Sequence, residues 1–214
     1  MQNSESIGGK CEAVRRGRPR AFDREKALAA AMHLFWRKGF SATSISDLTA
    51  VMGIGSPSLY AAFGSKEALY AEALEHYGRM HEATAWGGFL AAATARDAVE
   101  AFLRDTAAGL TEAANGCMVT LSAVGAEGHE ELGALVASAR NATLFRLKER
   151  IEQAKAAGEI DRLVDTHRLA RFVQTVQNGM SLIARDGAEL GELIAVVDMA
   201  MLGWDAQLRE SPRV

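Results

Sequence analysis

Apolar residues recur three and four positions apart along most of the chain, which is the period of an amphipathic α-helix. No alternation of apolar and polar residues extends beyond a few positions, so strands are not expected. Glycines and capping residues mark the ends of the apolar stripes. The pattern predicts an all-α chain of about nine helices, over about 24–38, 45–52, 56–63, 66–86, 95–113, 117–126, 130–157, 166–185 and 188–209.

The segment Ser41–Leu69 reads SATSISDLTAVMGIGSPSLYAAFGSKEAL. It holds two short helical patterns joined by a turn at Gly53, followed by the start of a longer helix. In the second pattern Leu59 and Phe63 face inward, whereas the outer positions are small or polar. A short helix that is supported from behind and carries such residues outward can enter the DNA major groove.

Charge is divided unevenly along the chain. A basic arm, Arg15-Arg16-Gly17-Arg18-Pro19-Arg20, precedes the first helix. Residues 1–66 hold ten Lys or Arg and five Asp or Glu, a formal charge of +5. Residues 67–214 hold 14 basic and 22 acidic residues, a formal charge of −8. A basic region on an acidic remainder indicates that only the N-terminal part meets a polyanion.

We therefore predict a DNA-reading unit at about 44–63. The outer residues of helix 56–63 are expected to face the bases: Ser56, Pro57, Ser58 and Ala61. The expected phosphate contacts are hydroxyls and cations at helix starts, on the same helix and on the arm: Thr43, Ser44, Tyr60, Lys66, Arg18 and Arg20.

At this point the segment resembles the N-terminal domain of TetR-family transcriptional regulators. The family pattern has a first helix ending in Phe-x-x-x-Gly followed by Phe or Tyr, then a Thr-rich helix start, Gly with Val or Ile, Leu-Tyr, Phe, and a Lys-Glu pair. The matching residues are Phe35, Gly39-Phe40, Thr43, Gly53-Ile54, Leu59-Tyr60, Phe63 and Lys66-Glu67-Ala68-Leu69. The match covers about residues 20–75 without a gap.

Three departures from the family pattern bear on DNA contact. Ala62 stands where the family often has His, which removes one phosphate contact. Gly55 replaces the usual Ser, so the cap of the third helix is expected to shift to Ser56. Thr49 and Met52 replace small residues between the second and third helices. The motif is intact, but the target DNA sequence cannot be predicted from it.

The resemblance implies three parts: a flexible basic arm at 1–20, a helix-turn-helix domain at 21–66 and a helical effector-binding and dimerisation domain at 67–214. It also implies a homodimer on a near-palindromic DNA operator, with the two reading helices about one DNA turn apart or slightly more. Two wide apolar stripes on helices 166–185 and 188–209 allow such an interface. The expected interface residues are Leu169, Val173, Val176, Leu190, Ile194, Val197, Met201 and Trp204. The alternative is that both stripes are intramolecular core.

The resemblance further implies a pocket for a small-molecule effector in the C-terminal part, without a resident cofactor. The candidate lining consists of large apolar residues and two glutamines on the central helices: Trp86, Phe89, Phe102, Met118, Leu121, Phe145, Phe172, Gln174, Gln177 and Met180. Each apolar residue can equally be plain core, and the glutamines can equally stabilise a dimer seam.

Other chemistry is weakly indicated. Glu127, His129, Glu130 and Glu131 follow one another at a helix start, where acidic residues are favoured without any metal. Cys117 after Gly116 can be a redox-active thiol or an inert core cysteine. The sequence contains no phosphate-binding loop, nucleophile elbow or dinucleotide fingerprint, so neither an enzyme nor a metal site is expected.

No apolar run reaches the roughly 18 residues that a membrane helix needs, and the N-terminus lacks the apolar centre of a signal peptide. We expect a cytoplasmic, homodimeric, ligand-responsive transcriptional regulator, most simply a repressor. Two alternatives stay open: a DNA-binding regulator without an effector, and an oligomeric helical adaptor that has lost DNA binding. The adaptor is disfavoured because Arg18, Arg20 and Lys66 are present and residues 55–63 contain no acid.

Overall fold

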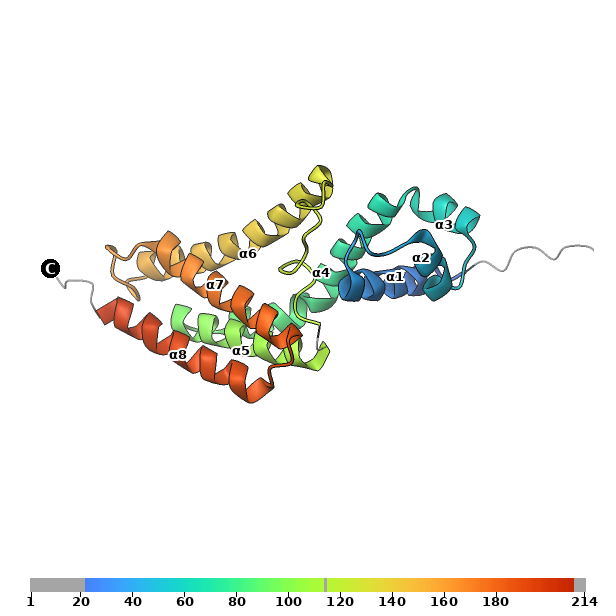
Figure 1. Cartoon of the computed structure of the whole chain (residues 1–214). Coiled ribbons are helices and arrows are strands. Elements are labelled where there is room, and N and C mark those ends of the chain that lie inside the picture. The colour runs from blue at the N-terminus through green and yellow to red at the C-terminus, as the bar shows by residue number, and fades with distance from the viewer. Residues whose placement is uncertain (1–21, 114, 210–214) are drawn as a thin grey trace, which may run out of the picture.

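We describe residues 22–113 and 115–209 of a computed structural model of the chain. Within these residues the fold is entirely helical, as the sequence predicts (Figure 1). The helices are α1 (Arg24–Lys38), α2 (Ile45–Met52), α3 (Ser56–Phe63), α4 (Lys66–Ala91), α5 (Ala95–Ala113), α6 (Glu130–Ala156), α7 (Thr166–Arg185) and α8 (Leu190–Arg209). The described part therefore has eight helices rather than about nine.

The molecule has two parts that α4 connects (Figure 1). We call α1, α2 and α3 the head, and α5 to α8 the body. The first half of α4, including Leu69 and Tyr70, packs in the same apolar cluster as the head. The second half, including Trp86 and Phe89, packs in the cluster of the body. The packing thus changes from one part to the other within α4.

Helix α4 continues past the predicted end near Trp86 and runs to Ala91. Gly87 and Gly88 lie inside it, and Gly88 lies where α4 packs on α5. A Cβ on Gly88 would lie 2.6 Å from a carboxylate oxygen of Asp105 and 3.0 Å from the Cβ of Ala101. Gly88 therefore allows the two helices to approach closely, which a sequence pattern alone does not reveal.

The predicted helix at 117–126 is wrong, because this segment forms successive turns. The guanidinium of Arg140 donates to the carbonyl oxygens of Val119, Thr120 and Ser122, at 3.1, 2.9 and 2.7 Å. These carbonyls are then directed at α6 instead of at amides four residues along the chain. The segment lies between the head and the body, so we call residues 115–129 the bridge segment.

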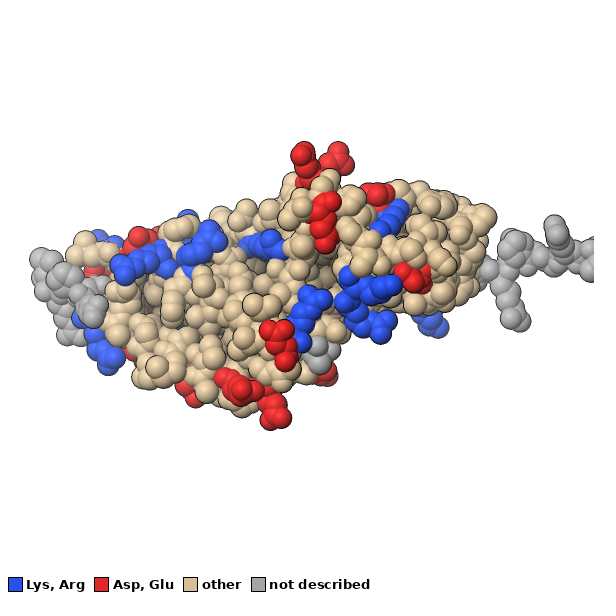
Figure 2. Space-filling model, in the orientation of Figure 1, with Lys and Arg blue, Asp and Glu red and all other residues tan. Residues whose placement is uncertain are grey.

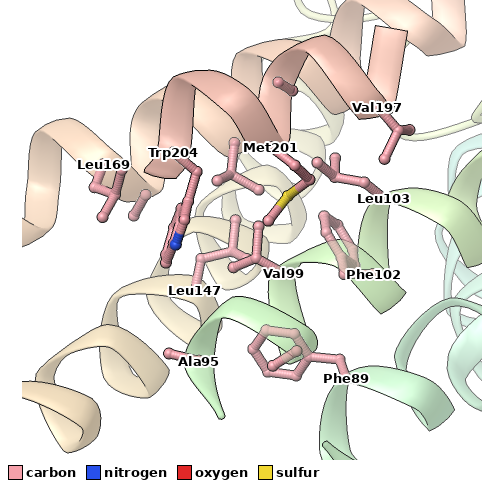
Figure 3. Packing of buried hydrophobic residues seen from close by; sticks show 14 of the residues in the cluster. Phe89, Ala95, Val99, Phe102, Leu103, Leu147, Leu169, Val197, Met201 and Trp204 are labelled. Carbon is pink, nitrogen blue, oxygen red and sulfur yellow. The ribbon is translucent and has the colours of Figure 1, made fainter. Parts of the chain in front are cut away.

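The core of the body is built where α5, α6, α7 and α8 converge (Figure 3). Trp204 and Met201 of α8 lie against Val99 and Leu103 of α5, with Leu147 of α6 close by. All five side chains are almost completely buried. Burial of this much apolar surface, at about 25 cal/mol per Å², is the main source of the body's stability.

Candidate nucleic-acid interface and body cavity

The start of α2 is fixed by reciprocal hydrogen bonds. The Ser44 hydroxyl accepts from the backbone N–H of Asp47, and the Asp47 carboxylate accepts from the backbone N–H of Ser44, each at 3.0 Å. Lys38 at the end of α1 donates to the same carboxylate at 2.8 Å. The Lys38 hydrogen bond, followed by those from Ser44, lowers the pKa of Asp47 to about 2. Three local groups thus set the angle between α1 and α2.

The turn between α2 and α3 depends on Gly53, whose φ of 65° is in the left-handed region. The N-cap of α3 is Gly55, which has no side chain to accept a hydrogen bond. The expected shift of the cap to Ser56 is therefore wrong, since Ser56 is already the first helical residue. Pro57 fits in the first turn because a helix start needs no N–H there.

Helix α3 presents an uncharged outer surface. Leu59 and Phe63 are buried against the rest of the head, with exposed fractions of 0% and 4%. The residues on the opposite side are exposed, and they are the set predicted to contact DNA from this helix: Ser56, Pro57, Ser58, Tyr60 and Ala61. In the view of Figure 2 the outer end of the head is correspondingly mostly tan.

Arg24 holds α3 in place from behind. Its guanidinium donates to the carbonyl oxygen of Ala62 at 3.2 Å and forms an ion pair with Glu72 of α4 at 2.8 Å. The same group lies 4.4 Å from the centroid of the Phe63 ring. One side chain of α1 therefore contacts both α3 and α4, which restricts how α3 can tilt.

The predicted phosphate contacts are not equally placed. Ser44 and Tyr60 are exposed, whereas Thr43 is buried and its hydroxyl donates to the Gly39 carbonyl at 2.7 Å. The geometry therefore leaves the Thr43 side chain unable to reach a phosphate. The Lys66 ammonium lies 4.1 Å from the centroid of the Phe40 ring, and burial lowers its pKa. Arg18 and Arg20 lie outside the described residues.

A cavity of about 320 Å³ lies in the body, within the range of ligand sites. Its walls come from α1, α4, α5, α6, α7 and the bridge segment. The aromatic part of the wall consists of Trp36, Tyr77, His81, Trp86 and Phe102. The polar part consists of Thr84, Asp105, Thr106, Thr120, Arg140, Thr143, Arg146, Gln174, Gln177 and Asn178, with Glu82 beside Arg146.

The charged groups of the cavity wall compensate one another. Arg146 pairs with Glu82 at 2.6 Å and lies 4.9 Å from the centroid of the Trp86 ring. Arg140 is satisfied by the three bridge carbonyls, and Asp105 supplies a second carboxylate. Burial lowers the pKa of His81, which favours the neutral ring. Two guanidinium groups and two carboxylates thus leave the wall with no net formal charge.

The cavity contains some of the predicted effector residues. Trp86, Phe102, Gln174 and Gln177 line it. Of the remaining candidates, Phe89 and Met180 are buried in the body cluster, and Met118 packs with the head cluster. The last three are not part of this wall either: Leu121, which lies in the bridge segment, and Phe145 and Phe172, which are exposed.

Sequence reasoning missed several wall residues, above all Trp36, Tyr77 and His81. Trp36 follows Phe35 of the apolar stripe of α1, and it packs in the head cluster while also lining the cavity. A large apolar residue that widens a helix stripe in this way indicates a second contact surface. The Trp36 and Tyr77 ring centroids are 5.1 Å apart, and those of Trp36 and His81 are 5.6 Å apart. The Nε2 atom of His81 is buried without a hydrogen-bond partner.

The structure places most of the predicted dimer residues inside the chain's own core. These are Leu169, Val173, Val197, Met201 and Trp204, all at most 4% exposed. Val176 and Ile194 are partly buried, and Leu190 is exposed. The apolar residues that α7 and α8 leave exposed share only Leu190 with the predicted set: Phe172, Leu182, Ile183, Leu190, Val196, Met199 and Leu202. We call this set the outer α7–α8 face.

Among the described residues no group of three or more His, Cys, Asp or Glu side chains is arranged to hold a metal ion. The search for a membrane-spanning helix, over the same residues, found none that is long and apolar enough.

The geometry defines a class of protein. Two short helices are joined by a glycine turn, and the second of them is supported from behind and exposes small uncharged side chains. This is the helix-turn-helix arrangement of DNA-binding proteins, here attached to a larger helical body with a cavity.

The family follows from comparison with known proteins. Residues 27–73 match the family described as "Bacterial regulatory proteins, tetR family". The chain is 32% identical over 205 residues to the HTH-type transcriptional repressor ComR of Escherichia coli (strain K12), with 91% of this chain and 94% of ComR covered. The chain belongs to the TetR family of DNA-binding transcriptional regulators.

Two further relatives agree. The HTH-type transcriptional repressor BdcR of Escherichia coli (strain K12) is 52% identical over 61 residues, which are 28% of this chain and 31% of BdcR. Among solved structures, a cysteine mutant of the TetR family transcriptional regulator CifR, complexed with 26-bp double-strand operator DNA, superposes with a TM-score of 0.83. It is 39% identical and covers 88% of this chain and 100% of the CifR chain.

Proposed function

We propose that this regulator is a cytoplasmic repressor that binds a near-palindromic operator as a homodimer and leaves it when a small molecule occupies the body cavity. Support comes from the similarity to ComR and BdcR, which are named as repressors, and to CifR, which is solved on operator DNA. The observation that carries the proposal is the exposed, uncharged α3 on a head whose first helix also contributes to the cavity wall.

In this proposal α3 enters the major groove. Ser56, Pro57, Ser58 and Ala61 face the bases, since they are exposed and opposite to the buried side of α3. Ser44 and Tyr60 bind phosphates next to the groove. Lys66, Arg18 and Arg20 remain proposed phosphate contacts. Thr43 instead supports the α1–α2 turn from inside.

The outer α7–α8 face is the proposed dimer interface. A Cβ on Gly203 of α8 would lie 3.6 Å from the Phe172 ring of α7, so the two helices meet at this face. Met199 is 69% exposed and Leu202 59% exposed, which is unusual for large apolar residues that face only solvent. In a two-fold homodimer this face packs against the same face of the partner protomer, so that the exposed apolar residues of both protomers are buried.

The dimer is tested with Met199→Asp, which places a charge in the proposed interface. Analytical ultracentrifugation is expected to show a dimer for the wild type and a monomer for this variant. Ala137→Asp, at an exposed position of α6, is the matched control and is expected to remain a dimer. If Met199→Asp sediments like the wild type, the interface lies elsewhere.

Effector release is tested in two stages. Compounds that raise the melting temperature of the protein are first identified, because a ligand stabilises the folded state that it binds. Each is then added to the protein on labelled DNA from upstream of its own gene. A true effector is expected to weaken DNA binding by about 5- to 150-fold. If every compound that binds leaves the DNA affinity unchanged, the protein is a regulator without an effector.

A further inference from the structure

Trp36 is the point at which the head reaches the body cavity. Of the described residues of α1, α2 and α3, it alone lines that cavity. The residue is 7% exposed, and its ring packs edge-on against that of Tyr77. A molecule in the cavity therefore touches a side chain that belongs to the DNA-binding head itself. No intermediate helix is needed to relay that contact.

The peptide unit between Gly116 and Cys117 joins the head to α7. Its carbonyl oxygen accepts a hydrogen bond from the indole Nε1 of Trp36 at 2.9 Å. Its N–H donates to the hydroxyl of Ser181 in α7 at 2.7 Å. Because a peptide unit is planar and rigid, these two bonds couple the position of Trp36 to that of Ser181. We call this unit the junction peptide.

The junction peptide has little freedom on the α7 side. Gly116 has a φ of 65°, and a Cβ there would lie 2.5 Å from the Ser181 carbonyl oxygen. Ser181 itself is completely buried. The exposed Phe172 and Ile183 occur on the same helix, in the proposed dimer interface. The junction peptide therefore connects the head to the helix that, in the proposed dimer, lies beside the two-fold axis.

The cavity borders the junction peptide directly. Gly116 and Cys117 both line it, beside Trp36. A ligand that fills the cavity presses on the peptide unit and competes with it for the Trp36 indole. Because interiors are closely packed, such pressure is relieved by a discrete shift rather than by gradual compression.

The wall also indicates the chemistry of the ligand. Flat rings of Trp36, Tyr77, Trp86 and Phe102 surround the space, and aromatic rings pack best against other rings. The charged groups of the wall cancel, so the wall does not select a charged ligand. Gln177 and Asn178 offer uncharged polar groups at the edge of the cavity. A volume of about 320 Å³ is at the small end of ligand sites.

We propose that the junction peptide is the switch of this regulator, that Trp36 is the positioning residue through which it holds the head, and that a compact, uncharged aromatic molecule operates it. The inference rests on the proposed function, because it assumes that the cavity controls DNA binding. In the free protein the Trp36 bond keeps the head in its DNA-binding orientation. Occupation of the cavity breaks that bond, and the head turns relative to α7.

The test fills the cavity without a ligand. Gly109 of α5 lines the cavity, and a Cβ there meets no atom within 4 Å, so Gly109→Leu inserts a side chain into the space. Gly87→Leu is the matched control, because Gly87 also has open space around it but does not line the cavity. Trp36→Phe removes the indole donor and keeps a ring. Trp86→Phe is its control in the same wall.

Operator affinity is measured for the single and double variants. Gly109→Leu and Trp36→Phe are each expected to weaken binding by about 5- to 150-fold, whereas Gly87→Leu has no effect. The double variant Gly109→Leu/Trp36→Phe is expected to bind the operator no more weakly than whichever of its two single variants binds less tightly, because both changes break the same hydrogen bond. For the control pair Trp86→Phe and Gly109→Leu, the fold-change in operator affinity of the double variant is expected to equal the product of the two single fold-changes.

The outcomes separate two failures. If the effects of Gly109→Leu and Trp36→Phe multiply, the junction is not the switch, although the cavity still controls DNA binding. If Gly109→Leu folds normally and keeps wild-type affinity, the proposed effector control fails as well. Ser181→Ala breaks the other half of the junction. Ser181→Ala must weaken operator binding, and it must cause no further loss of affinity when it is combined with Trp36→Phe. Any other result overturns the inference.

The ligand class has its own test with three probes. 2-Naphthol, an uncharged aromatic, is expected to raise the melting temperature and to weaken operator binding. 2-Naphthoate keeps the aromatic rings but is charged, and cyclohexanol is uncharged but not aromatic. Both are expected to raise the melting temperature and to weaken operator binding less than 2-naphthol does. Gly109→Leu is expected to abolish the effect of 2-naphthol. Stabilisation by either of the other probes alone, or by none of the three, overturns the assigned class.

Discussion

The head and the bridge segment each contain a glycine with a φ of 65°, Gly53 and Gly116, and the surroundings of the two differ. A Cβ on Gly53 in the head would meet no atom within 4 Å, whereas a Cβ on Gly116 would meet the Ser181 carbonyl oxygen at 2.5 Å. The turn in the head is therefore determined by local residues. The turn at the edge of the body is determined by contacts with helices far away in the sequence. This difference separates a turn that depends on its own residues from a turn that depends on the packing of α7.

The largest expected effect compares a core leucine of each part. Leu59 of α3 and Leu193 of α8 are both completely buried, so truncation of either to Ala is expected to cost about 2–5 kcal/mol of unfolding free energy. Only Leu59→Ala should also abolish operator binding where the protein remains folded, since it loosens α3. Urea denaturation and fluorescence anisotropy measure the two quantities. Equal loss of DNA binding in both variants would remove the distinction between the parts.

The two glycines provide the second comparison. Gly53→Ala is expected to lower the free energy of unfolding by about 1–2 kcal/mol, because a residue with a side chain is strained in the left-handed conformation. Gly116→Ala is expected to cost about 1–3 kcal/mol more, because the added methyl overlaps backbone atoms as well. Thermal unfolding of the two variants measures the difference. Similar melting temperatures for the two variants would show that the bridge segment shifts to accommodate the added methyl group, and would contradict the expected rigidity of this segment.

A charge on the outer surface of α3 is expected to affect binding without affecting stability. Ser58→Asp places a carboxylate opposite the DNA and is expected to weaken operator binding by about 1–3 kcal/mol. Ser138→Asp adds the same charge at an exposed position of α6 and serves as the control. Binding of Ser58→Asp at wild-type affinity would exclude α3 as the reading helix.

The smallest expected effect concerns pH and the head alone. The pKa of Asp47 is about 2 in the folded head and about 3.8 when unperturbed, because Lys38 and Ser44 donate to the carboxylate. The lowered pKa means that Asp47 stabilises the fold above about pH 3.8 and that this contribution is lost as the pH falls towards 2. Asp47→Asn is expected to be less stable than the wild type at neutral pH, with the gap closing in acid. A gap independent of pH would contradict the assignment.

The same division explains what the sequence could predict. The cap at Ser44, the turn at Gly53 and the support by Leu59 and Phe63 were predictable, because each depends on residues within a few positions. The family resemblance rests on the same local signals. The helices of the head therefore match the sequence prediction, whereas the cap at Ser56 was wrong and the Thr43 side chain is buried.

The body was predicted less well, because its features depend on distant contacts. The turns at 117–126 exist because Arg140, on α6, donates hydrogen bonds to three carbonyl oxygens of this segment. Most of the residues predicted for the dimer interface are buried in the chain's own core, since both sides of α8 are apolar and periodicity does not show which one faces that core. Val197 and Met201 face inward, whereas Val196 and Met199 remain exposed. Trp36 was missed because its partner Gly116 lies 80 positions away.

The most direct test of the central claim is the affinity of the wild-type protein for DNA from upstream of its own gene, measured beside a scrambled sequence of equal length at about 50 and about 200 mM salt. We expect a specific complex of two protomers on the upstream DNA, tighter than on the scrambled DNA and weaker at the higher salt concentration. Equal affinity for the two sequences, with no dependence on salt, would contradict that expectation.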